Sequence, residues 1–327
     1  MLTAARAGDE RAFEELVMPH RRELRALCYR MSGSIHDADD LIQEVLLRAW
    51  KGLAAFKGDA SVRTWLYKIT VNTCLTALAA KKRRALPNEL GPAGDVATPM
   101  VPLYEPIWIE PCPEELYADP QPTAETRYGM RESVALAFLT ALQVLPARQR
   151  ALVLLHDVLG WSATECAELL EISSAGVNSA LQRARETLEA KPRPRHRDDA
   201  ALRSLHERYV RAWEAADLAA LVALLHEDAT LAMPPIPVWL CGARALEQSM
   251  AAMVFASAVP GTFRIRATHA NGEPALAIYR RDDATNELRP FALQLLGTRD
   301  DKIDSIVAFL DPSLFAFFGL PASDHDE

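Results

Sequence analysis

The sequence predicts a multidomain protein in which two all-α domains precede an α+β domain. Apolar residues recur at helical spacing through residues 1–84 and again through residues 126–192. A stretch rich in proline, residues 85–125, separates these two blocks, and proline interrupts helices. Only the last block, residues 198–320, adds the alternation of apolar and polar residues that is typical of half-buried β-strands.

Length and composition limit what the chain can be. Its 327 residues suffice for two or three domains, and 50% apolar with 24% charged residues is the balance of a globular protein. No apolar stretch is long enough to cross a membrane, and the charged N-terminus lacks a signal core, so we expect a cytoplasmic protein. The five scattered cysteines form no CxxC pair, which argues against disulfides and zinc, and we expect neither metal nor cofactor.

Charge is distributed unevenly along the chain. The net charge is −8, which taken alone argues against nucleic acid as a partner. However, residues 1–84 carry +5 and residues 129–197 carry +2, whereas residues 85–128 carry −7 and residues 198–327 carry −8. This alternation indicates modules with different partners.

The first block contains an amphipathic helix over residues 37–50. Its apolar residues share one arc, and the opposite arc carries Asp37, Asp40, Gln43 and Glu44. The simplest interpretation is a solvated helix face. The functional interpretation is an acidic surface that docks on a basic partner protein.

The next helical pattern, residues 61–78, is apolar on both faces and leads into the basic residues 81–84. It fits either a central core helix or a helix that turns one face to a partner. The side chains of Trp65, Lys68 and Asn72 also suit single-stranded DNA, since bases stack on aromatic rings while cations follow the phosphates.

The acidic, proline-rich linker 85–125 holds too many apolar residues for a purely solvated tether. We therefore expect part of it to lie on a domain surface, with Trp108 and Ile109 as its anchor.

A helix-turn-helix pattern ends the second block. Ser162 followed by Glu165 is a capping-box signature for its first helix, and Ser173 or Ser174 can cap the second. The outward face of the second helix is polar, as hydrogen bonding to base edges in the major groove requires. The candidate side chains are Ser174, Asn178, Ser179, Gln182, Arg183 and Arg185. A plain helical hairpin is the alternative.

The last block begins with helical patterns at 200–215, 217–225 and 243–256 and continues with strand-like runs, which indicates helices followed by an antiparallel sheet. Some of its large side chains are candidates for a pocket lining, although such residues more often fill a core. These are Trp213, Met233, Trp239, Tyr279 and Phe309.

Three motifs together resemble the extracytoplasmic-function sigma factors of the sigma-70 family. DADDLIQEV resembles the region that grips the clamp helices of the RNA polymerase β′ subunit. FKGDASVRTWLYKITVNTCLTAL resembles the region that melts and reads the −10 promoter element, with matches at Arg63-Thr64-Trp65-Leu66 and at Asn72. LPARQRALVLLHDVLGWSATECAELLEISSAGVNSALQRARETL resembles the domain that reads the −35 element.

This resemblance implies that residues 1–84 form sigma region 2 and residues 126–192 form sigma region 4. It implies core RNA polymerase, through its β′ clamp helices and β flap, and promoter DNA as partners. The residues implied to contact polymerase are Asp37, Asp40, Gln43 and Glu44. The residues implied to contact the −10 element are Arg63, Trp65, Lys68, Asn72, Lys81, Lys82 and Arg83. One departure is Thr76, where the family usually carries Asp.

The last block, residues 198–320, contains RYVRAWEAADLAALVALLHEDATLAMPP, a turn at Trp239–Gly242 and final strands that end in FGLP. In these parts it resembles a SnoaL-like domain of the NTF2-like superfamily, a cone of curved sheet and helices. The resemblance implies a regulatory domain that takes a small-molecule or protein ligand. NTF2-like cones also include enzymes with a carboxylate base, for which His226, Asp228 and His269 are the candidates. The HEDAT segment lies where a helix meets a strand, a place typical of surface or capping residues, so we expect no catalysis.

We therefore expect a promoter-specificity subunit of RNA polymerase with a fused domain that modulates it. A helix-turn-helix operator-binding regulator, and an NTF2-like enzyme fused to a DNA-binding module, are the alternatives. Because the linker and the last block are acidic, they could cover the basic DNA-reading surfaces, with Trp108 and Ile109 anchoring the closed state.

Overall fold

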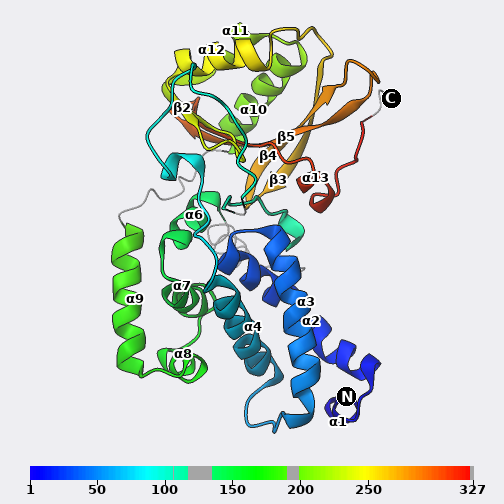
Figure 1. Cartoon of the computed structure of the whole chain (residues 1–327), viewed down its shortest axis with the longest axis vertical. Coiled ribbons are helices and arrows are strands. Elements are labelled where there is room, and N and C mark those ends of the chain that lie inside the picture. Colours follow the sequence, from blue (N-terminus) through cyan, green and yellow to red (C-terminus); the bar gives the residue numbers. More distant parts are fainter. Residues whose placement is uncertain (106, 117–134, 190–198, 325–327) are drawn as a thin grey trace. The chain divides into compact units, whose positions relative to one another are not determined.

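A computed structural model describes residues 1–105, 107–116, 135–189 and 199–324 (Figure 1). The chain divides into two compact units. The helical unit comprises Met1–Arg84 and Glu114–Pro194, and the sheet unit comprises Ala85–Pro113 and Arg195–Glu327. None of the helices in the described ranges has the length and apolar character needed to cross a membrane.

The first part of the helical unit consists of α1 (Leu2–Arg6), α2 (Glu10–Ser32), α3 (Ile35–Gly52) and α4 (Val62–Leu78). Polar caps begin the three longer helices. The side chains of Asp9, Ser34 and Ser61 accept hydrogen bonds from the main-chain N–H groups of the first turns of α2, α3 and α4. The apolar arc of α3 is buried, as its periodicity predicts, and α4 is buried along most of its length.

The second part of the helical unit consists of α6 (Leu136–Val144), α7 (Ala147–Val153), the π-helical turn η4 (Leu154–Val158), α8 (Ala163–Leu170) and α9 (Ser174–Glu189). The predicted capping box is confirmed: the Ser162 hydroxyl accepts from the Glu165 N–H, and the Glu165 carboxylate accepts from the Ser162 N–H. Between α8 and α9 the chain turns at Glu171, whose φ of 57° is left-handed. Ser173, rather than Ser174, caps α9, since its hydroxyl accepts from the Gly176 N–H.

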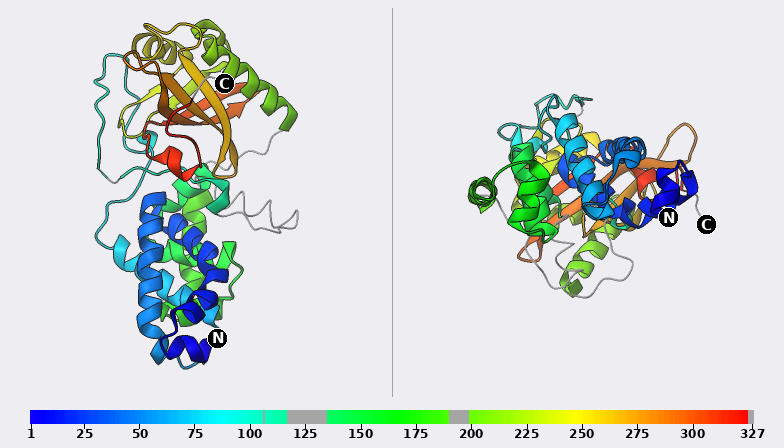
Figure 2. Two further views of the ribbon diagram at one scale, coloured as in Figure 1. Left: turned by 90° about the vertical axis from the view of Figure 1, so that its right-hand side faces the viewer. Right: turned by 90° about the horizontal axis from the view of Figure 1, so that it is seen from below.

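The sheet unit has the element order α10 (Asp199–Glu214), α11 (Leu218–Ala223), β1 (Leu225–Ala232), β2 (Trp239–Cys241), α12 (Ala243–Met253), β3 (Phe263–Ala270), β4 (Glu273–Arg281), β5 (Leu288–Arg299), β6 (Lys302–Phe309) and α13 (Leu314–Phe317). The strand order is β2-β1-β6-β5-β4-β3. Helices α10 to α12 pack on one face of this curled sheet around a shared apolar core (Figure 2).

The prediction of helices followed by an antiparallel sheet is wrong in one respect. The strand β1 precedes α12 and pairs in parallel with β6, so the sheet is mixed. The sequence hides this strand because residues 226–228, in its first half, are polar and partly or fully exposed, and they therefore resemble a helix cap. The residues around Trp239, expected as a turn, form the short strand β2.

The proline-rich segment is not a free tether over the described residues. Residues 85–105 and 107–113, here called the strap, belong to the sheet unit and contain the 3₁₀ turn η2 (Pro87–Glu89). The rest of the predicted linker includes the short turn η3 (Glu114–Leu116), and residues 117–125 lie outside the described ranges.

Candidate functional site

The acidic arc of α3 is partly free and partly engaged. Asp40 and Gln43 are exposed and make no side-chain hydrogen bond to any described residue. Glu44 accepts from Arg48 one turn later, at 2.6 Å. Leu47 shares this face by its spacing from Asp40 and Glu44 and is 47% exposed, an apolar spot that the charge pattern did not single out.

Asp37 differs from the other three residues because it has internal partners. Its carboxylate accepts from Lys81 and from Arg84, each at 2.8 Å, so α3 is tied to the chain that follows α4. Burial tends to raise the pKa of Asp37, but the hydrogen bonds from Lys81 and Arg84 outweigh it, and the pKa is lowered. Asp37 was predicted to contact polymerase and Lys81 was predicted to contact DNA. In the structure, these two side chains instead form an ion pair with each other.

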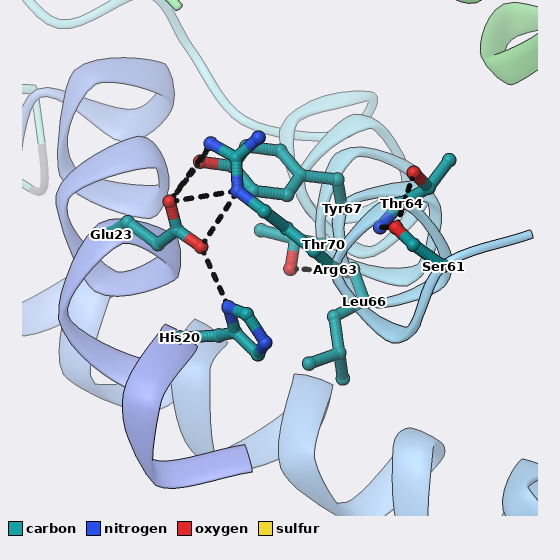
Figure 3. A network of polar contacts seen from close by, with 8 residues as sticks. All are labelled: His20, Glu23, Ser61, Arg63, Thr64, Leu66, Tyr67 and Thr70. Carbon is teal, nitrogen blue, oxygen red and sulfur yellow. Dashed lines mark hydrogen bonds and ion pairs between the residues drawn. The ribbon is translucent and has the colours of Figure 1, made fainter. Parts of the chain in front are cut away.

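The start of α4 is fixed by a polar network centred on Glu23 of α2 (Figure 3). Arg63 donates to both Glu23 oxygens at 3.0–3.2 Å, and the Tyr67 hydroxyl donates to Glu23 at 3.0 Å. His20 is 2.9 Å from the same carboxylate. Burial tends to raise the pKa of Glu23, yet these partners lower it. Arg63, a predicted −10 residue, thus holds α4 against α2.

The other predicted −10 residues of α4 lie on different faces. The Trp65 ring packs on Phe56 with centroids 4.9 Å apart, which places it against the turn before α4. Asn72 is exposed, and Lys68 forms an ion pair at 3.0 Å with Glu171 of the helix-turn-helix. After α4, Lys81, Lys82 and Arg83 form an exposed basic stretch.

The helix-turn-helix presents the polar face that the sequence predicts. All six candidate residues of α9 are exposed, while the apolar stripe that includes Val177 and Leu181 is buried. Gln182 donates to Glu186 at 3.1 Å. Arg183 makes no side-chain hydrogen bond or ion pair to any described residue. A groove beside this face runs between α9 and η4 and is lined by Asn178, Gln182 and Arg185 together with His156.

Sequence reasoning missed the residue that partners Arg185. Asp157 of η4 accepts from Arg185 Nε at 3.1 Å and from its Nη2 at 2.5 Å. Burial tends to raise the pKa of Asp157, but the bonds from Arg185 and His156 lower it. The two residues are 28 positions apart in the chain, so a local sequence pattern could not predict that they form a pair.

The two parts of the helical unit also contact each other directly. The Tyr67 ring of α4 packs against Trp161, which precedes α8, with centroids 5.1 Å apart. Gln143 donates to the Arg30 carbonyl at 3.3 Å, and the buried Arg150 donates to the Met31 carbonyl. Residues of the helix-turn-helix part thus complete the C-terminal end of α2.

The predicted anchor residues of the strap are both buried, Trp108 with 7% and Ile109 with 0% of its surface exposed. The Trp108 indole donates to the Leu103 carbonyl at 2.7 Å, and residues 85 and 108 form a parallel bridge. Two loops of the sheet unit hold the strap. Cys112 exchanges two hydrogen bonds with Asn271, at 2.8 and 3.0 Å, in the turn between β3 and β4.

The second loop lies around β2. The main-chain N–H of Gly94 donates to Trp239 O at 2.9 Å, and the Trp239 indole donates to Gly91 O, also at 2.9 Å. A Cβ atom at Gly94 would lie only 2.6 Å from Val238 Cγ1, so the close approach of the strap requires glycine there.

The structure does not bring the five predicted pocket residues together. Trp213 and Met233 belong to the core on the helix-covered face, where Trp213 packs edge-on against Phe263 at 4.9 Å. Tyr279 neighbours the core residue Ile278 in β4 and therefore faces the other side, where it contacts Phe315 of α13 at 5.2 Å. Phe309 follows the core residue Ala308 in β6 and therefore also faces the side of the sheet away from that core. The Trp239 indole donates a hydrogen bond to the strap.

The candidates for catalysis lie on β1 and β3, where His226 is partly buried and Asp228 and His269 are exposed. His226 Nδ1 is 2.8 Å from Arg299 Nη2, and the exposed Asp228 lies 3.5 Å from the same guanidinium. His269 is exposed in β3 and does not belong to this group. The arrangement is a surface ion-pair cluster, as the simpler interpretation of HEDAT predicts.

Comparison with known protein families matches three parts of the chain. Residues 16–84 match Sigma-70 region 2, residues 135–188 match Sigma-70, region 4, and residues 206–306 match a SnoaL-like domain. A crystal structure of the Mycobacterium tuberculosis extracytoplasmic function sigma factor SigJ covers 95% of this chain and 99% of its own, with 22% identity and a TM-score of 0.58. The two chains therefore share the same fold over nearly their whole lengths.

Sequence relatives extend the likeness over nearly the whole chain. The ECF RNA polymerase sigma factor SigG of Mycobacterium tuberculosis is 45% identical over 324 residues, which is 97% of this chain and 85% of the relative. The ECF RNA polymerase sigma factor SigM of the same species is 34% identical over 188 residues, 58% of this chain and 81% of the relative. The chain therefore belongs to the ECF sigma factors of RNA polymerase, with a SnoaL-like domain at its C-terminal end.

Proposed function

We propose that this sigma factor docks on the β′ clamp helices through α3, holds the −10 strand along α4, and reads −35 duplex with α9 while the β flap supports region 4. The observation that carries this proposal is the exposed polar face of α9 on a capped helix-turn-helix, in the same compact unit as the exposed Asp40 and Gln43 of α3. It acts in the cytoplasm, where core polymerase and promoter DNA are present.

The positions of the side chains assign different contacts to different residues. On α3, Asp40, Gln43 and Glu44 are available to a basic partner, whereas Asp37 serves the internal contact to Lys81 and Arg84. On α4, Asn72 is exposed for a base, and Lys68 is released for phosphate when its exposed pair with Glu171 opens. Opening is inexpensive because exposed ion pairs contribute about 0–1 kcal/mol.

The chain itself catalyses no reaction in this proposal. His226 and Asp228 are engaged with Arg299, and Trp213 and Tyr279 pack against other side chains on opposite faces of the sheet. The sheet unit instead serves as a regulatory domain that binds the strap, and a small-molecule or protein ligand would act through that contact. A plain operator-binding regulator would leave the exposed acidic residues of α3 without a role.

Run-off transcription with purified core polymerase tests the proposal. Full-length protein should direct initiation from a cognate promoter that core polymerase alone ignores. Asn178→Ala or Gln182→Ala should change the preference among −35 variants, since a bidentate base contact is worth about 1–3 kcal/mol. Tight, sequence-specific binding to linear duplex without polymerase, with no initiation in its presence, would favour the operator-binding alternative.

A further inference from the structure

The contact between Asp157 and Arg185 uses only one edge of the guanidinium. Asp157 engages Nε and Nη2, so the terminal fork made by Nη1 and the second Nη2 hydrogen stays available. The Arg185 side chain remains 50% exposed and lines the groove between α9 and η4. A fork of two N–H groups matches the O6 and N7 acceptors of guanine in the major groove.

Asp157 is itself held in place. It lies in the π-helical turn η4, where His156 Nδ1 is 2.7 Å from the carboxylate oxygen that also accepts from Arg185 Nη2. The backbone of η4 therefore places the Asp157 carboxylate, and the carboxylate in turn fixes the Arg185 side chain of α9. A long arginine side chain that is already ordered loses less conformational freedom when it binds.

Arg183 provides the contrast on the same helix. It is exposed, carries the same charge and has no side-chain partner among the described residues. A cation with a free side chain can follow a phosphate of any sequence, whereas a fixed fork favours one base edge.

We propose that Asp157 is a positioning residue for promoter recognition: it orients Arg185 so that the free fork of the guanidinium reads a guanine of the −35 element, while Arg183 contacts phosphate. This inference rests on the proposed function. The competing role for Asp157 is a mask that merely neutralises Arg185, and the two roles differ in what the loss of the carboxylate does to base preference.

The test uses holoenzyme assembled from core polymerase and full-length protein on a promoter library with a randomised −35 element. Arg185→Ala should reduce discrimination at one base position by about 5- to 100-fold. Asp157→Asn should reduce it at the same position by about 3- to 10-fold, because it removes the orienting charge but leaves the arginine. The double variant should match Arg185→Ala, and Asp157→Glu should retain the preference.

Two comparisons complete the design. Glu168→Gln changes an exposed carboxylate of α8 that has no side-chain partner among the described residues, and it should leave every base preference intact. Arg183→Ala should weaken all sequences alike and reduce the salt dependence of binding. Melting temperatures identify any unfolded variant, and Asp157→Ala, which also removes the carboxylate, decides the question if Asp157→Asn does not fold.

The inference is overturned if Asp157→Asn keeps the wild-type preference at every position, or if it raises transcription from all promoters equally, as a mask would. Failure of the wild-type holoenzyme to initiate at all would instead overturn the proposed function. Selective initiation by wild type together with an unaltered Asp157→Asn profile would overturn the positioning role alone.

Discussion

Arg150 offers a sharp test of how the two parts of the helical unit are joined. Its side chain is only 5% exposed and donates to the carbonyls of Leu142 at 3.0 Å, Gln143 at 3.2 Å and Leu145 at 3.1 Å. It also donates to the Gln143 side chain and to the carbonyl of Met31 in α2. Burial, with a smaller contribution from Arg83, lowers the pKa of Arg150 to about 10, so the group is still cationic at neutral pH.

Several of these acceptors are carbonyls at the C-terminal end of α6, where the helix itself supplies no donors and the dipole is negative. Arg150→Met removes all five bonds at similar side-chain volume. Loss of one partner in a buried charged network costs about 3–5 kcal/mol, and we expect that loss in the free energy of unfolding. Arg150→Lys, with three donors in place of five, should lose less.

The assay is urea unfolding followed by circular dichroism, with Arg148→Met as the matched control. Arg148 lies on the same helix, is exposed and has no side-chain partner among the described residues, so its substitution should change stability by less than about 0.5 kcal/mol. A loss of under about 1 kcal/mol in Arg150→Met would refute the reasoning, because buried carbonyls left without a donor cannot be that inexpensive.

Three further predictions concern the helical unit. Reversing Asp40 and Glu44 to Lys should weaken core-polymerase binding in a pull-down while circular dichroism stays unchanged, and unchanged binding by the folded variant would contradict the docking role. Glu171→Gly removes the Lys68 pair but suits the left-handed backbone, so unfolding free energy should shift by less than about 1 kcal/mol; a larger loss would show that the pair matters more than its exposure implies. Glu23→Gln should cost about 1–2 kcal/mol at neutral pH. Because folding lowers the pKa of Glu23, that contribution is present above the unfolded pKa and is lost as pH falls through the folded pKa; an unfolding difference that persists unchanged in acid would contradict the assignment.

Two of these variants have a control at another exposed carboxylate of the helical unit. Glu14→Gln, on an exposed part of α2 without a side-chain partner among the described residues, should show no acid-dependent change in stability. Glu189→Lys, at the end of α9, reverses a charge far along the chain from α3 and should leave polymerase capture intact.

Local features of this fold could be read from the sequence because they depend on nearby residues. The capping box of Ser162 and Glu165 spans three positions, and the buried arc of α3 repeats every turn. The exposed face of α9 follows from the same periodicity.

Partners far apart in the chain could not be read in this way. The ion pairs of Asp37 with Lys81 and Arg84 span 44 and 47 positions, and they exist because α3 and α4 pack side by side. Likewise, the parallel pairing of β1 with β6 depends on a crossover that passes through the rest of the sheet. Charge patterns thus identified which side chains are polar but not which of them are already engaged.

The strap leads to the last prediction, which concerns regulation. It is the covalent path from region 2 to region 4, and it is bound to the sheet unit rather than free. Deleting the chain after residue 195 would remove the surface that covers the strap and expose its apolar residues. A truncated protein could therefore aggregate, and a change in its transcription would not isolate the effect of the sheet unit on regulation. A point substitution avoids this problem.

Trp108→Ala and Tyr104→Ala form a matched pair on the strap, because Trp108 is 7% exposed and Tyr104 is 84% exposed. Loss of the buried indole should loosen the strap, since a Trp-to-Ala change in a core costs about 3–5 kcal/mol, whereas loss of the exposed ring should not. A loosened strap lets region 2 and region 4 move more freely relative to each other. Because docking of the strap is expected to restrain the two regions, Trp108→Ala should raise run-off transcription from a cognate promoter. Equal transcription by wild type, Trp108→Ala and Tyr104→Ala at matched concentrations, with the strap of Trp108→Ala shown by limited proteolysis to be released, would leave strap docking without a regulatory role.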